Sequence, residues 1–312
     1  MVTAQPPARP RRSFRERLFG NPVVLKELRG RMRGARAFIV LTVYLALMSG
    51  FVTLVYVLFT SSAPIIGPSQ GGEIGRVLFI SIVGVELFLV TFIAPAFAAG
   101  AISGERERQT YDLLRTTLLP ARSLVWGKLF ATLSYIFLLL LAAIPLQSIA
   151  FLFGGVSEQE IILSFVVLVA TTLLLGTVGV FFSALTRRTL SASVLSYAVA
   201  LVTILVLPVA LVVFAPVFGQ AMFSGGAFPG WLEAALYYGL GLLVATNPMA
   251  TLLATLYLLI DRQVAGVFSI TLLNGSSIWL ISPWIVFVIF SLIVSLVLVI
   301  LAVRRVNRID EA

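Results

Sequence analysis

The chain has 312 residues, of which 60% are hydrophobic and only 11% are charged, and its formal net charge is +9 at pH 7. A soluble domain carries roughly 25% charged residues, so a soluble core of this length could not hide so much apolar surface. Cysteine and histidine are both absent, which excludes disulfide bonds, Cys/His metal sites and nucleophile pairs that depend on these residues.

The N-terminal part is basic. Residues 1–20 are rich in proline and arginine, and we expect a disordered tail there and no cleaved signal peptide. A helix is predicted to begin at Asn21, which can cap it, because Pro22 suits the first helical position. Over 21–36 apolar residues recur every three or four positions and basic residues occupy the other faces. We predict an amphipathic helix in the cytoplasmic membrane interface, with an unstructured basic flank as the alternative.

Long apolar runs follow, and each can cross a hydrocarbon layer of ~30 Å as a helix of about 20 residues. Short polar or charged connections separate most of these runs. The predicted fold class is therefore all-α, a polytopic membrane protein with six transmembrane helices. The predicted spans are at about 37–60, 77–101, 125–153, 161–185, 191–217 and 279–303.

The positions of Lys and Arg predict the orientation. With the N-terminus inside, segments 1–36, 102–128, 186–190 and 304–312 are cytoplasmic and hold 20 of the 22 Lys and Arg residues. Both termini are then expected on the cytoplasmic side of the inner (plasma) membrane. The basic residues flank apolar runs and form no patch on a polar domain, so nucleic-acid binding is not expected.

Residues 218–278 permit two interpretations. The stretch 235–260 is apolar enough to span, but Pro248 interrupts it, and one additional crossing would place the C-terminal arginines outside. We predict a helical hairpin over 231–274 that enters the outer leaflet without crossing. The alternative has eight crossings, with 263–282 as the additional span.

A charged connection, 102–124, follows the second predicted span and carries more charge than a turn needs. Asp112 lies four residues after Arg108 and three residues before Arg115, so it can pair with them within a helix. Leucines between these charges supply an apolar ridge. A short amphipathic helix below the membrane suits docking on a soluble partner, and a lipid-facing surface helix is the alternative.

This region resembles the loop between the second and third helices of type-2 ABC exporter permeases. In that family an Ala/Gly-rich helix end, a Glu-Arg-Glu run, a Thr, a Leu-rich turn, a Pro and a Gly-Lys-Leu recur in this order. Gln109 departs from this order, because a Gly is common at that position in the family. Residues 21–38 likewise resemble the N-terminal interfacial helix of such permeases. The matching residues are AFAAGAISG at 96–104, Glu105-Arg106-Glu107, Thr110, Leu113-Leu114, Pro120 and Gly127-Lys128-Leu129.

The resemblance implies a transmembrane permease domain over 21–312 with a coupling helix at about 107–119 that contacts a separate ABC ATP-binding subunit. The sequence contains no GxxxxGK[ST] loop, so ATP and Mg would bind that partner and this chain would hold no cofactor and be no enzyme. A second membrane half, from another copy or a paralogous permease, and membrane lipid are the other implied partners. The implied ATPase-coupling residues are Glu105, Arg106, Glu107, Thr110, Asp112, Leu113 and Leu114.

Glu86 lies near the middle of the second predicted span, where a carboxylate costs about 2.5–3.5 kcal/mol. It is a candidate for the transport path, or it pairs with a polar group such as Gln147, Thr171 or Thr172. A stand-alone secondary transporter is the rival function, although the chain has no clear internal repeat and only one deep carboxylate. A membrane enzyme and a membrane anchor for a soluble complex are further alternatives. The residues do not predict the substrate.

Overall fold

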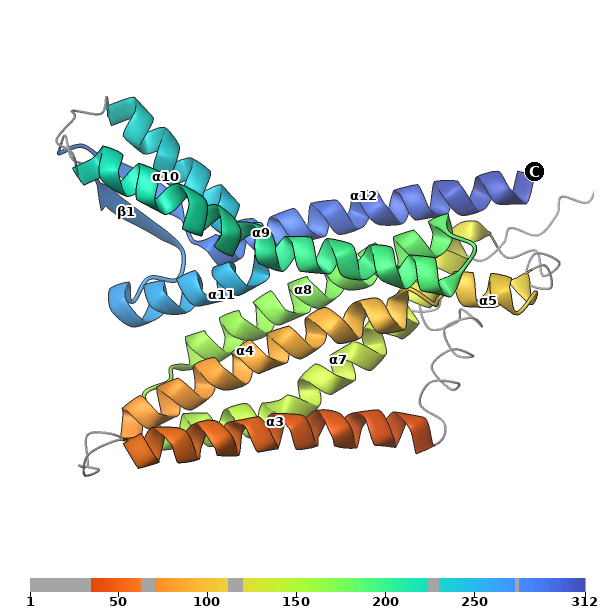
Figure 1. Ribbon diagram of the computed structural model, residues 1–312, viewed down its shortest axis with the longest axis horizontal. Helices are drawn as coiled ribbons and strands as arrows, with labels where there is room; N and C mark the ends of the chain where they lie inside the picture. Colours follow the sequence, from red (N-terminus) through yellow and green to blue (C-terminus); the bar gives the residue numbers. More distant parts are fainter. Residues whose placement is uncertain (1–34, 63–70, 112–119, 224–229, 273–274, 312) are drawn as a thin grey trace, which may run out of the picture.

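The fold is given by a computed structural model, which describes residues 35–62, 71–111, 120–223, 230–272 and 275–311 (Figure 1). Among these residues, six helices are long and apolar enough to cross a membrane, as predicted. The basic tail at 1–20 and nearly all of the predicted interfacial helix at 21–36 lie outside the described residues. The six helices are α3 (Ala35–Ser62), α4 (Gly71–Ala98), α7 (Ala121–Phe153), α8 (Glu158–Leu185), α9 (Thr189–Phe223) and α12 (Pro283–Glu311).

Helices α4 and α8 form the centre of the bundle. Helix α8 contacts α4, α7, α9 and α12, whereas α3 lies at one edge and covers α4 and α7 (Figure 1). The two central helices approach closely at Gly179, where an added Cβ would lie 2.4 Å from the Cβ of Ala98. Small residues allow this approach, which is how helices gain packing energy in a membrane.

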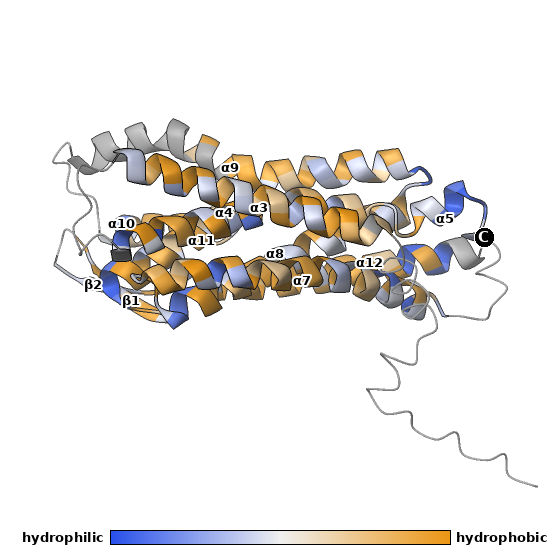
Figure 2. Cartoon of the chain, turned by 90° about the horizontal axis from the view of Figure 1, so that it is seen from below, coloured by the Kyte–Doolittle hydropathy of each residue, from blue (hydrophilic) through white to orange (hydrophobic). Residues whose placement is uncertain are grey.

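The outer surface of the bundle is apolar along the helices and charged at the ends. Figure 2 shows hydrophobic residues along the lengths of the long helices. On α3, for example, Phe38, Leu47 and Leu54 are each more than half exposed. A soluble protein does not expose continuous apolar surface of this kind, whereas lipid tails cover it. The chain is therefore a multi-pass membrane protein.

A sharply bent helix pair precedes the last long helix. Helix α10 (Gly230–Val244) and helix α11 (Pro248–Tyr257) meet at an angle of 116°. The Asn247 side chain caps α11, because its Oδ1 accepts the N–H of Ala250 at 3.0 Å. A five-residue π-helix, Leu258–Arg262, continues α11. Two helices joined near Pro248 thus occupy the first part of the stretch in which the helical hairpin is expected.

Its second half differs from the prediction because residues 267–281 form a β-hairpin. Strands β1 (Val267–Thr271) and β2 (Ser277–Ile281) pair antiparallel, with Val267 opposite Ile281. The all-α expectation missed this element, and the alternative of a helical span over 263–282 is wrong. The physical reason is local: β-branched and aromatic residues lie on both sides of an Asn-Gly dipeptide, which favours a hairpin.

Candidate functional site

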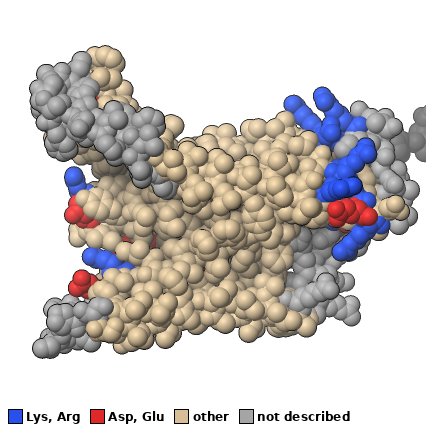
Figure 3. All heavy atoms as spheres, viewed as in Figure 1, with Lys and Arg blue, Asp and Glu red and all other residues tan. Residues whose placement is uncertain are grey.

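The basic residues gather at the end of the bundle that carries α5 (Ser103–Glu107) and the C-terminal end of α12 (Figure 3). Helix α5 follows α4 directly and is fixed at its start by α8. The Ser183 hydroxyl accepts hydrogen bonds from the N–H groups of Ile102 and Ser103, at 2.8 and 2.9 Å. Because Ser103 and Ser183 are fully buried, this contact anchors the charged residues that follow.

Glu105 connects α5 to α7. Its Oε1 accepts a hydrogen bond from Lys128 Nζ at 2.5 Å, and the Lys128 side chain is only 3% exposed. A lysine side chain that is this deeply buried needs a carboxylate nearby, because an unpaired buried charge is costly. The pair therefore fixes the start of α7 against α5.

Arg106 connects α5 to the end of α8. Its Nη1 donates to the carbonyl oxygens of Ala184 at 3.1 Å and Thr186 at 3.0 Å. The last carbonyls of a helix have no intrahelical donor, so the guanidinium supplies one. The same guanidinium lies 5.1 Å from the ring centroid of Tyr111, in cation–π contact.

Glu107 connects α5 to the start of α9. Its two carboxylate oxygens accept hydrogen bonds from the Thr189 N–H at 2.8 Å and the Thr189 hydroxyl at 2.6 Å. Thr189 is the first residue of α9. A carboxylate at this position satisfies an unpaired N–H and interacts favourably with the positive end of the helix dipole.

The chain turns sharply after α5. Gln109 has a left-handed backbone with φ of 57°, and the Thr110 N–H and hydroxyl both donate to the Glu105 carbonyl. The predicted continuous helix at 107–119 is therefore wrong at its start, because a helix cannot continue through residues 108–110. The left-handed φ also explains why glycine suits position 109, a feature that sequence reasoning did not use. Asp112, Leu113 and Leu114 lie outside the described residues.

We name Glu105, Arg106 and Glu107 the ERE junction, because three consecutive residues contact three different helices. The resemblance implies that these residues couple the chain to an ATPase, and within the chain their charges contact three helices. Sequence reasoning missed Lys128 and Thr189 as their partners, which are 23 and 82 residues away from Glu105 and Glu107. The only available signals were a lysine at a membrane boundary and a threonine just before an apolar run.

A second polar site lies inside the bundle. Gln147 Nε2, on α7, donates to Glu86 Oε2, on α4, at 2.7 Å, and both residues are buried. Of the three predicted partners, the structure selects Gln147. Thr171 and Thr172 instead donate to carbonyl oxygens of their own helix, one turn earlier.

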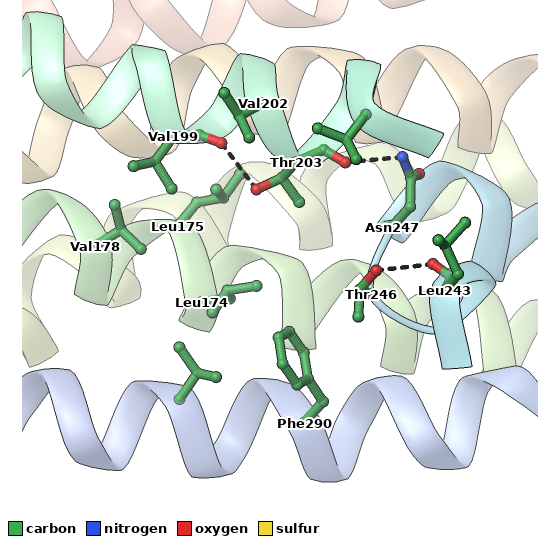
Figure 4. Close-up of a pocket in the computed structure, with 12 residues that line it drawn as sticks. Leu174, Leu175, Val178, Val199, Val202, Thr203, Leu243, Thr246, Asn247 and Phe290 are labelled. Carbon is green, nitrogen blue, oxygen red and sulfur yellow. Dashed lines mark hydrogen bonds between the residues drawn. The ribbon is translucent and has the colours of Figure 1, made fainter. Parts of the chain in front are cut away.

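An apolar pocket of about 320 Å³ lies between α8, α9, α12 and the turn that joins α10 to α11 (Figure 4). Its polar groups are engaged within the chain. The hydroxyls of Thr203 and Thr246 donate to the carbonyls of Val199 and Leu243, and the Asn247 amide donates to the backbone of α9. Glu86 is not among the residues that line this pocket, which offers apolar surface to a ligand.

No protein-family model matches the chain, and no curated protein sequence matches it. Over the described ranges, there is also no cluster of three or more His, Cys, Asp or Glu side chains that could hold a metal ion. A functional assignment therefore depends on the residues and their geometry.

Proposed function

We propose that the chain is the membrane-spanning permease subunit of an ATP-driven ABC exporter of the type-2 family, which couples ATP hydrolysis by a separate subunit to substrate export. One observation carries the proposal. The Glu-Arg-Glu run, which is the most specific part of the family resemblance, contacts α7, α8 and α9 at the same end of the bundle. Residues 112–119, which are proposed to contact the ATPase, follow this run directly.

In this mechanism the ERE junction transmits movement. Closure of two ATPase subunits displaces the segment after Thr110, and the junction carries that displacement to the ends of three membrane helices. The Glu105–Lys128 pair resists separation, because breaking a buried ion pair costs roughly 3–5 kcal/mol. The helices therefore move together with the loop, and the bundle changes between inward- and outward-open states.

The proposal includes an orientation. The end of the bundle that carries α5, the C-terminus and most basic residues faces the cytoplasm. Residues 21–36 are proposed to lie in the cytoplasmic interface of the inner (plasma) membrane. The α10–α11 pair then enters the outer leaflet, where exposed Trp231 and Trp279 suit the lipid headgroup region. A second membrane half, from a copy or a paralogue, completes the exporter.

A stand-alone secondary transporter is the second candidate, and the buried Glu86–Gln147 pair favours it. Such transporters use polar groups near the middle of the membrane to bind substrate or a coupling ion. The two candidates differ in their energy source. An exporter subunit needs ATP and a Walker-motif ATPase, whereas a secondary transporter moves cargo in vesicles that contain this chain alone.

The test is purification of the full-length chain from its native membranes, with identification of partners by mass spectrometry and measurement of ATP hydrolysis by the complex. We expect a Walker-motif ATPase in stoichiometric amount. The Asp112→Arg variant should lose the ATPase, because the change alters the proposed contact segment.

Asp261→Arg is the matched control, because it makes the same change at an exposed residue beyond α11. This variant should retain the ATPase. Purification of the wild-type chain with no ATPase, or equal retention of the ATPase by both variants, would contradict the assignment of the contact segment.

A further inference from the structure

The Glu86 carboxyl group is fully buried among apolar residues in the middle of α4. Its Oε2 accepts the hydrogen bond from Gln147, but its Oε1 has no partner among the described residues. A buried acceptor without a partner costs about 1–3 kcal/mol, so native structures seldom contain one without a bound water, ion or proton. The position of Oε1 therefore indicates a bound species.

Two more buried oxygens without a described partner belong to the helices around Glu86. They are the side-chain carbonyl oxygen of Gln147, on α7, and the hydroxyl of Tyr44, on α3. The Tyr44 hydroxyl is close enough to Glu86 for the two groups to interact electrostatically. Three helices thus each contribute one unsatisfied oxygen to the same buried region.

No described positive charge compensates a carboxylate at Glu86. The helices that contact α4 are α3, α7, α8, α9 and α11, and their described charged side chains lie near the helix ends. The tyrosines at 135 and 197 donate to backbone carbonyls elsewhere in the bundle. Tyr44 is the titratable side chain that interacts with Glu86. The charged side chains near the ends of these helices are Arg122 and Lys128 on α7 and Glu158 and Glu160 on α8.

We propose that Glu86 and Gln147, covered by Tyr44, form an exchangeable proton-binding site in the middle of the membrane. A proton on Glu86 Oε1 makes that atom a donor, and the Gln147 carbonyl oxygen or the Tyr44 hydroxyl oxygen accepts its hydrogen bond. One proton therefore satisfies two of the three unpaired oxygens and removes the cost of a buried carboxylate. Three oxygens are too few for Mg²⁺ or Ca²⁺, which take six or more.

Helix α3 is the element that controls exchange. Its only buried side chains in the described part of the helix are Tyr44 and Met48, one turn apart, and most of its remaining surface is exposed. Because α3 lies at the edge of the bundle, it can move away without separating α4 from α8 (Figure 1). Such a movement removes Tyr44 from Glu86, and the proton exchanges with water that enters the space left between α3 and α4.

Infrared spectroscopy of the full-length chain in lipid nanodiscs tests the site and needs no ATPase, so its outcome is separate from that of the proposed function. A protonated carboxyl group gives a carbonyl stretch that carboxylates lack. We expect this band at neutral pH, its loss in Glu86→Gln, and a shift of the band when H₂O is replaced by D₂O. Glu73→Gln is the matched control, because Glu73 is an exposed carboxyl at the start of the same helix.

Gln147→Leu should shift the wild-type band, because it removes the donor to Glu86 Oε2, and a shift in Tyr44→Phe identifies the Tyr44 hydroxyl as the acceptor. Two results would overturn the site. A Glu86→Gln spectrum identical to wild type would show that Glu86 holds no proton. A band that is lost in Glu86→Gln but never shifts in D₂O would show a fixed proton and exclude exchange.

Discussion

The Asn247 side chain donates a hydrogen bond to the carbonyl oxygen of Ile204 at 2.8 Å, four residues before Pro208 in α9. Proline has no N–H, so the helix itself leaves this carbonyl without its usual donor. A second hydrogen bond of the same length joins the Asn247 amide to the carbonyl of Thr203. The turn between α10 and α11 is therefore attached to α9 at the point where proline interrupts its hydrogen bonds.

Asn247→Leu should destabilise the chain by roughly 2–4 kcal/mol. The change removes the cap of α11, which contributes about 1 kcal/mol, and leaves the partly buried Ile204 carbonyl unpaired at about 1–3 kcal/mol. The midpoint of thermal unfolding in detergent measures the effect. Asn307→Leu, at an exposed residue of α12, is the control and should leave the midpoint near that of wild type.

Lys128→Met should destabilise the chain by roughly 3–5 kcal/mol, because the Glu105 carboxylate loses its cation in a largely buried place. Adding Glu105→Gln should restore much of the loss. The two single variants and the double variant form a cycle whose interaction energy is read from denaturation curves. Additive losses would show that the pair contributes nothing to stability.

Gln109→Gly should stabilise the chain by roughly 1 kcal/mol, because glycine adopts the left-handed backbone without the cost that other residues carry. Gln263 has φ of 52°, so Gln263→Gly should have the same sign. Gln159→Gly is the control with the opposite expected sign. It should destabilise the chain, because Gln159 lies in the first turn of α8 and glycine lowers helix stability. Thermal unfolding of the three variants distinguishes these outcomes, and destabilisation by Gln109→Gly would contradict the turn at 108–110.

Thr189→Val should lower ATP-driven export several-fold while the ATPase stays bound. The change removes the hydroxyl donor to Glu107 and keeps the β-branched shape, so α9 loses part of its connection to α5. Transport in proteoliposomes and the amount of co-purified ATPase measure the two effects separately. Thr53→Val is the control, because the Thr53 hydroxyl on α3 is exposed and donates to the carbonyl of Ser49 one turn earlier.

Sequence reasoning predicted the six long helices because twenty-residue apolar runs leave few alternatives in a membrane. It failed at the β-hairpin, where two five-residue strands lie in a stretch too short and too mixed to show a clear period. It also failed for the ERE junction, because contacts such as Glu107–Thr189 depend on how α4, α8 and α9 pack. Periodicity describes one element at a time and contains no information on that packing.

The proposed function depends most directly on the contact between the segment after Thr110 and an ATPase. Because the chain has no cysteine, a Leu113→Cys variant carries a single thiol that can be cross-linked in native membranes. We predict a cross-linked product with a Walker-motif ATPase whose yield changes when ATP is added, and none from Trp279→Cys at the opposite end. Failure of Leu113→Cys to cross-link to any ATPase, or labelling of its thiol from outside intact cells, would contradict the account.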